Sequence, residues 1–227
     1  MADLRIGDIL PSVGDIKVGT QNVSRIYTGS TLIFPSYACT LGDVTIGTQT
    51  FMGCNLNVDT YRNGDPIPEV KLNNDWFSLT TGAWCYYGID TANGVIYGKL
   101  YNWYAVNDPR GLAPVGYHVP TNAEFTTLAN YLGGYLVAGG KMKQTGTGLW
   151  ASPNVGATNT SGFTSIPAGY RGQSVGFNSL GHYTAFWTSM ALNSVNAIYR
   201  FSTGAYEYFA DHDVSKKTGF SVRLIKD

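Results

Sequence analysis

The sequence has little charge of either sign, few cysteines and no long hydrophobic run. Asp, Glu, Lys and Arg together make up only 13% of its 227 residues, which is about half the share that is usual in soluble proteins. The formal net charge is zero, so we expect no basic surface for phosphates and no nucleic-acid partner. No apolar run approaches the roughly 20 residues that a membrane-spanning helix needs, so we expect no membrane insertion.

The cysteines and the N-terminus bear on where the protein matures. Cys39, Cys54 and Cys85 are an odd number and lack the Cys-x-x-Cys spacing of a zinc site. We expect them to be reduced and mostly buried, with a Cys39–Cys54 or Cys54–Cys85 disulfide as the alternative if the protein matures outside a cell. The first residues lack the basic start and apolar stretch of a signal peptide, so we expect no export by the usual route.

Aromatic residues and glycine are abundant instead. The chain has 16 Tyr, 5 Trp and 28 Gly. Tyr and Trp provide large contact areas at low entropic cost, which is typical of loop-rich binding proteins. A β-rich fold without any ligand explains the same composition, so composition alone leaves both interpretations open.

Residues 1–36 differ from the rest of the chain. Short strands are predicted at residues 16–19, 24–27 and 31–34, and Pro35 ends the last of them. Two or three strands alone are marginally stable in water, so this segment must pack on something else. We therefore predict an attachment or oligomerisation segment at residues 1–36 and a main domain at residues 37–227.

Two helices are predicted in the main domain. The first covers residues 100–106, where apolar residues have helical spacing. The second begins at Thr121, where Glu124 completes a capping box, and ends at Gly133. Strands are expected at residues 44–46, 50–52, 185–188, 197–201, 205–209 and 220–225. Strands, two helices and then a meander of strands and long loops predict an α+β fold.

Several separated motifs of the main domain match one family in the same order. They are Gly53–Asn57, Tyr97–Trp103, Ala113–Thr121, Phe186–Ser189 and Lys217–Arg223. With these motifs, residues 43–225 resemble the Fibrobacter succinogenes major paralogous domain family. The resemblance implies a C-type-lectin-like fold of two helices, a twisted antiparallel sheet and long loops. The chain departs from the family in lacking an export signal, and Leu224 stands where many members have a cysteine.

The N-terminal segment is similar to short segments of structural proteins from phages that infect Bacteroidetes and related bacteria. The similar residues are Val18-Gly19 and Ile26-Tyr27-Thr28-Gly29-Ser30. This resemblance implies a virion protein that is made in the host cytoplasm and bound to other virion proteins through residues 1–36. Related receptor-binding proteins imply a homo-oligomer, with a trimer as the first expectation.

No catalytic residue, metal site or cofactor is predicted. His118 precedes the helix cap, where we expect a structural role. All three cysteines precede residue 86, which argues against the late cysteine pair of the formylglycine-generating enzymes that share the lectin-like fold. Residues 211–213 supply fewer oxygens than the roughly six to eight that calcium needs.

The predicted binding surface lies in the last third of the chain, where the resemblance implies that the ligand is met. The candidates are His182, Met190, Asn193, Asn196, Tyr199, Tyr206, Tyr208 and His212. Strand alternation would place Tyr206 and Tyr208 on one face, and Tyr199 on the face opposite Arg200. Which of these faces belongs to the core stays open.

The expected function is adhesion without catalysis, through recognition of a glycan or protein on the host surface or in mucus. One alternative is a purely structural or decoration component of the virion. A second is a glycan-processing enzyme, which would need paired carboxylates about 5–9 Å apart.

Overall fold

The computed structural model describes residues 41–173 and 176–227, together with the backbone of five short strands in the first 40 residues. The chain divides into two units, Met1–Thr40 and Leu41–Asp227. In the first unit, β1 (Leu4–Arg5) pairs with β4 (Ile26–Thr28), β4 with β5 (Thr31–Leu32), and β2 (Lys17–Val18) with β3 (Gln21–Asn22). The other residues of the predicted attachment segment, and the assembly expected of it, lie outside the described residues.

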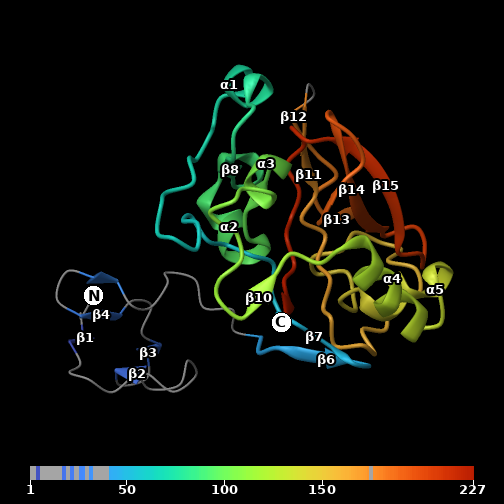
Figure 1. The fold of residues 1–227 in the computed structure, drawn as a ribbon. Coiled ribbons are helices and arrows are strands. Elements are labelled where there is room, and N and C mark those ends of the chain that lie inside the picture. The colour runs from blue at the N-terminus through green and yellow to red at the C-terminus, as the bar shows by residue number, and fades with distance from the viewer. Residues whose placement is uncertain are drawn as a thin grey trace. The chain divides into compact units, whose positions relative to one another are not determined.

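Residues 41–227 form an α+β unit with antiparallel sheets, as expected (Figure 1). Its first sheet has the order β10-β16-β7-β6 and joins both ends of the unit. The strands are β6 (Val44–Ile46), β7 (Gln49–Phe51), β10 (Tyr117–His118) and β16 (Ile225–Lys226). The hairpin predicted at residues 44–52 is confirmed, with Gly47 at φ 63° in its turn.

A longer sheet carries the candidate site. It consists of β13 (Tyr183–Ala191), β14 (Asn196–Thr203) and β15 (Ala210–Ser215) in that order. β13 and β14 contain the strands predicted at residues 185–188 and 197–201. Beside this sheet lies the hairpin of β11 (Tyr170–Gly172) and β12 (Gly176–Asn178).

The prediction of a strand at residues 205–209 is wrong. These residues connect β14 to β15 without pairing, because their backbone groups bind a helix instead. The Gly140 amide donates to the Glu207 carbonyl over 2.9 Å, and the Phe209 amide donates to the Tyr135 carbonyl over 2.7 Å. The strand predicted at residues 220–225 is likewise reduced to single bridges at Phe220 and Ser221 and to the start of β16.

The expectation of two helices is also wrong, because the described residues form five α-helices and one 3-10 helix. They are α1 (Asn73–Ser78), η1 (Tyr87–Ile89), α2 (Thr91–Tyr97), α3 (Trp103–Val106), α4 (Asn122–Tyr131) and α5 (Tyr135–Met142). None of the helices in this described part combines the length and the hydropathy needed to cross a bilayer.

Helix α3 begins later than predicted because Leu100 and Tyr101 form β9, which pairs with β8 (Trp84–Cys85). Asn102 then caps α3 by accepting a hydrogen bond from the Ala105 amide over 3.0 Å. The capping box of α4 is present as predicted, with Thr121 and Glu124 each binding the other's backbone amide. Such a cap contributes about 0.5–2 kcal/mol of stability.

Two aromatic clusters hold the sheets and helices together. Phe125 and Leu128 of α4 pack with Phe186 of β13 in one cluster. Trp103 and Trp187 are buried in the other, as expected of them. Each large apolar side chain that is fully buried contributes about 1.5–3 kcal/mol relative to an exposed one, so the cluster around Phe125 fixes the sheet against α4 and α5.

The cysteines differ from the expectation that all three are reduced. Cys85 is free and buried, and burial raises the pKa of its thiol to about 12. Cys54 is disulfide-bonded, so the expectation is wrong for this residue. Because Cys85 is free, the Cys54–Cys85 alternative is excluded, and the partner of Cys54 lies outside the described residues.

Candidate ligand-binding site

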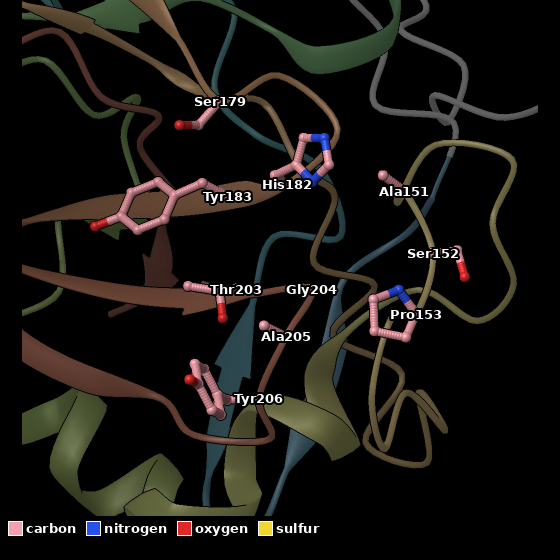
Figure 2. A pocket seen from close by; sticks show the side chains of 10 residues that line it. All are labelled: Ala151, Ser152, Pro153, Ser179, His182, Tyr183, Thr203, Gly204, Ala205 and Tyr206. Carbon is pink, nitrogen blue, oxygen red and sulfur yellow. The ribbon is translucent and has the colours of Figure 1, made fainter.

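A pocket of about 300 Å³ lies at one end of the sheet formed by β13, β14 and β15 (Figure 2). Three segments form its walls: the loop at residues 151–153, the start of β13 with the turn before it, and the end of β14 with the residues that follow. The lining residues are Ala151, Ser152, Pro153, Ser179, His182, Tyr183, Thr203, Gly204, Ala205 and Tyr206. The volume is at the lower end of the range for small-ligand sites, so it suits one small ring or one side chain.

Backbone hydrogen bonds tie the three wall segments to one another. The Ala151 amide donates to the Gly181 carbonyl over 2.7 Å, the Val155 amide to Gly204 over 2.8 Å, and the Gly204 amide to His182 over 3.0 Å. The pocket is therefore preformed, and a ligand does not have to order its walls. Preorganisation of this kind lowers the entropic cost of binding.

The polar groups of the pocket are hydroxyls and one imidazole. The hydroxyls belong to Ser152, Ser179, Tyr183, Thr203 and Tyr206, and the imidazole to His182. The Thr203 hydroxyl is buried and has no hydrogen-bond partner among the described residues. No acidic residue, lysine or arginine lines the pocket. Because hydroxyls both donate and accept, this lining favours an uncharged polar ligand.

Tyr206 presents its ring at the mouth of the pocket. The side chain is 58% exposed, and its ring stacks on that of Tyr208 with centroids 5.2 Å apart and planes at 18°. Tyr208 in turn meets Phe201 edge to face at 5.5 Å. Figure 2 shows Tyr206 and His182 on opposite sides of Thr203 and Ala205. Tyr206 is therefore both accessible and held in place by a packed neighbour.

Half-buried aromatic rings continue from the pocket along the sheet. We call Tyr183, Tyr199, Phe201 and Tyr208 the aromatic row. Tyr183 stacks on Phe201 at 5.4 Å, and its hydroxyl donates to that of Tyr199 over 3.3 Å. Burial raises the pKa of Tyr183 and of Tyr199, so both phenols are neutral at physiological pH.

The opposite face of β14 packs on helix α4. Arg200 is 4% exposed, and its guanidinium donates to the Asn122 side chain over 2.7 Å and to the Thr126 hydroxyl over 2.6 Å. Tyr199 and Arg200 therefore point to opposite faces, as strand alternation requires. The aromatic row belongs to the face that leads to the pocket.

The eight predicted site residues do not form one site. His182 and Tyr206 line the pocket, and Tyr208 supports Tyr206. Tyr199 lies in the aromatic row, and its ring is 6.4 Å from that of His212 across the β14–β15 ladder.

Met190, Asn193 and Asn196 lie at the other end of the sheet, around the turn between β13 and β14. Asn193 accepts hydrogen bonds from the Val195 and Asn196 amides, each over 2.8 Å, and the Asn196 side chain donates to Asp213 over 2.8 Å. Both asparagines hold this turn and its neighbouring strand together. Met190 is 50% exposed beside them.

Sequence reasoning did not nominate Ser152, Pro153 or Thr203 as binding residues, although they line the pocket; Ser179 lies in the glycine-flanked loop around His182, which the sequence did suggest for the binding surface. The Ser152-Pro153-Asn154 turn and the glycine-flanked stretch at residues 177–181 were the available signals. Neither signal shows that the two loops meet, because their contact depends on the hydrogen bond from the Ala151 amide to the Gly181 carbonyl, which only the folded chain forms.

One stretch of the sequence has the Gly-x-Ser-x-Gly spacing of a hydrolase nucleophile, at residues 172–176. In hydrolases this motif forms a sharp turn from a strand into a helix. Here Gly172 and Gly176 pair directly across the β11–β12 hairpin, so a strand and not a helix follows the motif. Among the described residues, no group of three His, Cys, Asp or Glu residues is placed to hold a metal ion.

Comparisons with known proteins give one match. A sequence model described as the Fibrobacter succinogenes major domain matches residues 44–226. The matched range contains the whole pocket and agrees with the range of 43–225 expected from the motifs. No curated protein sequence and no solved structure matches the chain.

Proposed function

The chain belongs to the Fibrobacter succinogenes major domain family, and we propose that it is a non-catalytic adhesion protein of a phage particle. Its ligand is an uncharged glycan or a protein on the host surface or in mucus. The observation that carries this proposal is the preformed pocket with the exposed Tyr206 at its mouth and an uncharged, hydroxyl-rich lining.

The chemistry of the pocket supports recognition of an uncharged ring. A tyrosine face offers a flat apolar contact, and its hydroxyl binds water or a polar ligand. The hydroxyls of Ser152 and Ser179 and the imidazole of His182 surround the same space. A sugar ring has an apolar face and hydroxyls at its edge, so it meets both kinds of group. A protein side chain such as Tyr or Asn meets them as well.

Binding fits this pocket better than glycan hydrolysis does. A glycoside hydrolase positions two carboxyl groups about 5–9 Å apart on either side of the bond that it cleaves. None of the residues that line the pocket is acidic. A bound sugar would therefore meet hydrogen-bonding groups and an aromatic ring there, without the acid and base that cleavage needs.

The proposals that the protein belongs to a phage particle and forms an oligomer are based on resemblance. Residues 18–30 are similar to segments of phage structural proteins, and residues 1–36 would bind other virion proteins or sister subunits. We also propose a C-type-lectin-like fold for residues 37–227 and a trimer in the particle. Several copies of a shallow pocket on one particle would add weak affinities into strong attachment.

The test is binding of the purified protein to an array of glycans and mucins. We expect selective binding by the native chain. Tyr206→Ala should weaken it about tenfold, which corresponds to about 1.4 kcal/mol, because the variant loses the exposed ring at the pocket mouth. The Tyr206→Ala/Tyr208→Ala variant should bind no better than Tyr206→Ala.

The matched control is Tyr131→Ala. Tyr131 is 66% exposed but lies on α4 against Gly47 and does not line the pocket, so this variant should bind as the native chain does. If both Tyr206 variants still bind selectively, the ligand binds somewhere other than this pocket. A folded protein that binds nothing on the array would favour the structural or decoration role.

A further inference from the structure

Lys143 lies under the pocket at the end of α5 and is completely buried. Its ammonium nitrogen donates three hydrogen bonds to backbone carbonyls. The acceptors are Val155 at 2.8 Å, Thr203 at 2.9 Å and Tyr206 at 2.8 Å. Val155 follows the loop wall of the pocket, and Thr203 and Tyr206 lie in the wall that follows β14. One side chain thus joins two walls that are about 50 residues apart in the sequence.

The number of hydrogen bonds matches the protonated form of the side chain. An ammonium group has three N–H donors and no acceptor, whereas the neutral amine has two donors and a lone pair. Only the charged form can therefore satisfy all three carbonyls. In the neutral form one carbonyl faces the lone pair, and a buried carbonyl without a partner is unfavourable.

We infer that Lys143 is the positioning residue of the pocket, and that its protonated side chain holds the loop at residues 151–155 against the segment at residues 203–206. Without these three hydrogen bonds the two walls loosen and the pocket loses its preformed shape. The consequence for ligand affinity rests on the proposed function. The movement of the walls does not, because it depends only on the three carbonyls.

The surroundings of Lys143 bring its titration close to physiological pH. Burial lowers the pKa of Lys143 to about 8, against the opposing field of the Glu207 carboxylate. The loop at residues 144–157 has no ionisable side chain, and the segment at residues 203–209 has Glu207 beside two tyrosines. His182 and Tyr183 lie in the third wall. Lys141, on the same helix, donates to the Leu132 carbonyl over 2.8 Å instead.

The lowered pKa of Lys143 means that burial disfavours the charge more strongly than the three hydrogen bonds favour it, and this sets the sign of the pH dependence. The pKa of Lys143 is lower in the folded chain than in the unfolded chain, so the unfolded chain binds more protons between about pH 8 and 10.5. In that range the contribution of Lys143 to the free energy of unfolding rises with pH. Opening of the walls hydrates Lys143 and raises its pKa in the same way, so opening should become rarer as pH rises through about 8.

Hydrogen–deuterium exchange of the full chain, followed by mass spectrometry, tests the inference without any ligand. The amides of Val155 and Gly204 report on the walls because both are hydrogen-bonded across them. In the native chain, normalised exchange at residues 151–157 and 203–207 should become about tenfold slower between about pH 7 and pH 9.5, because protonation of Lys143 favours the open walls. Rates are normalised to an unstructured reference peptide, because exchange itself is base-catalysed, and β6 and β7 serve as internal controls.

Lys143→Met should exchange faster than the native chain at both walls and should lose the pH dependence, whereas Lys141→Met should behave as the native chain does. If Lys143→Met does not fold, the pH profile of the native chain decides alone. Normalised exchange of both walls that stays constant through alkaline pH overturns the inference. Since no ligand is used, failure to bind mucin would contradict the proposed function and leave this result standing.

Discussion

At the scale of single residues, the unusual feature is that some of the few charged side chains are buried and bind several partners each. Arg200 and Lys143 are buried, and each donates several hydrogen bonds to groups far away in the sequence. With 13% charged residues, the chain cannot rely on surface ion pairs, which contribute only about 0–1 kcal/mol each. Buried cations that serve several carbonyls and hydroxyls connect its loops instead.

Replacement of Arg200 tests this use of charge. Arg200→Met keeps the apolar stem but leaves Asn122 and Thr126 of α4 without their donor, so the free energy of unfolding should fall by about 2–3 kcal/mol. Urea denaturation measures it. Lys71→Met is the control, because Lys71 pairs with Glu69 on the surface at 3.3 Å with 57% of its side chain exposed. A loss of stability no larger than that of the control would contradict the role assigned to Arg200.

At the scale of elements, α5 shows packing overriding helix propensity. Two adjacent glycines, Gly139 and Gly140, disfavour a helix by about 1 kcal/mol each relative to alanine. They are needed because a Cβ at Gly139 would collide with the Tyr208 carbonyl, and one at Gly140 would lie 2.6 Å from the Gly156 carbonyl. The glycines let α5 lie directly against the segments that build the pocket.

For Gly139 we predict a change in stability opposite to the one that helix propensity alone would give. Gly139→Ala should stabilise an isolated helix, but in the folded chain it should lower the free energy of unfolding by about 1–3 kcal/mol because of overpacking. Chemical denaturation measures the change. Gly148→Ala should be nearly neutral, because no atom lies within 4 Å of the added methyl group. Stabilisation by Gly139→Ala would show that α5 can move away from the Tyr208 carbonyl.

At the scale of the whole described unit, His118 joins the last residue of the chain to helix α4. Its Nδ1 lies 2.7 Å from Asp227, which follows β16, and its Nε2 lies 2.8 Å from Glu124 of α4. Both neighbours are carboxylates, which favour the protonated imidazole because it donates from both ring nitrogens. Burial opposes this charge, but the hydrogen bonds and charges of Glu124 and Asp227 outweigh it and raise the pKa of His118. The structural role expected for His118 fits these contacts.

The pH dependence of stability follows from the raised pKa of His118. Its contribution is complete below the unfolded-state pKa of about 6.5 and is lost as pH rises through the folded-state value. The native chain should therefore exceed His118→Gln in stability at about pH 6 by less than about 1 kcal/mol, since the group is partly exposed. That difference should shrink by about pH 8.5. Urea denaturation at both pH values measures it, and a constant difference would contradict the ion pairs.

Ligand binding is also expected to depend on the whole described unit. The pocket contains residues from three segments between residues 151 and 206, and no single element provides it. A variant in any one wall is therefore expected to act on the same site, and Tyr206 suits the test because its side chain is exposed.

The sequence by itself determined the α+β class, the family, the capped helix α4 and the hairpin at residues 44–52. These features depend on local patterns: a capping box, alternating apolar residues and motifs of contiguous residues. It also placed Tyr206 and His182 among the candidates. The helix α5 and the irregular segment at residues 205–209 were missed, because propensity opposed the first and alternation wrongly favoured a strand in the second.

Only the tertiary structure decided which of the candidates meet. Pairing of β13 with β14 brings residues 179–183 beside residues 203–206 and sends Asn193 and Asn196 to the opposite end of the sheet. The hydrogen bonds from Lys143 then draw in the loop at residues 151–155. Such contacts depend on how strands, turns and a buried side chain are arranged in space. The spacing of residues along the chain does not determine that arrangement.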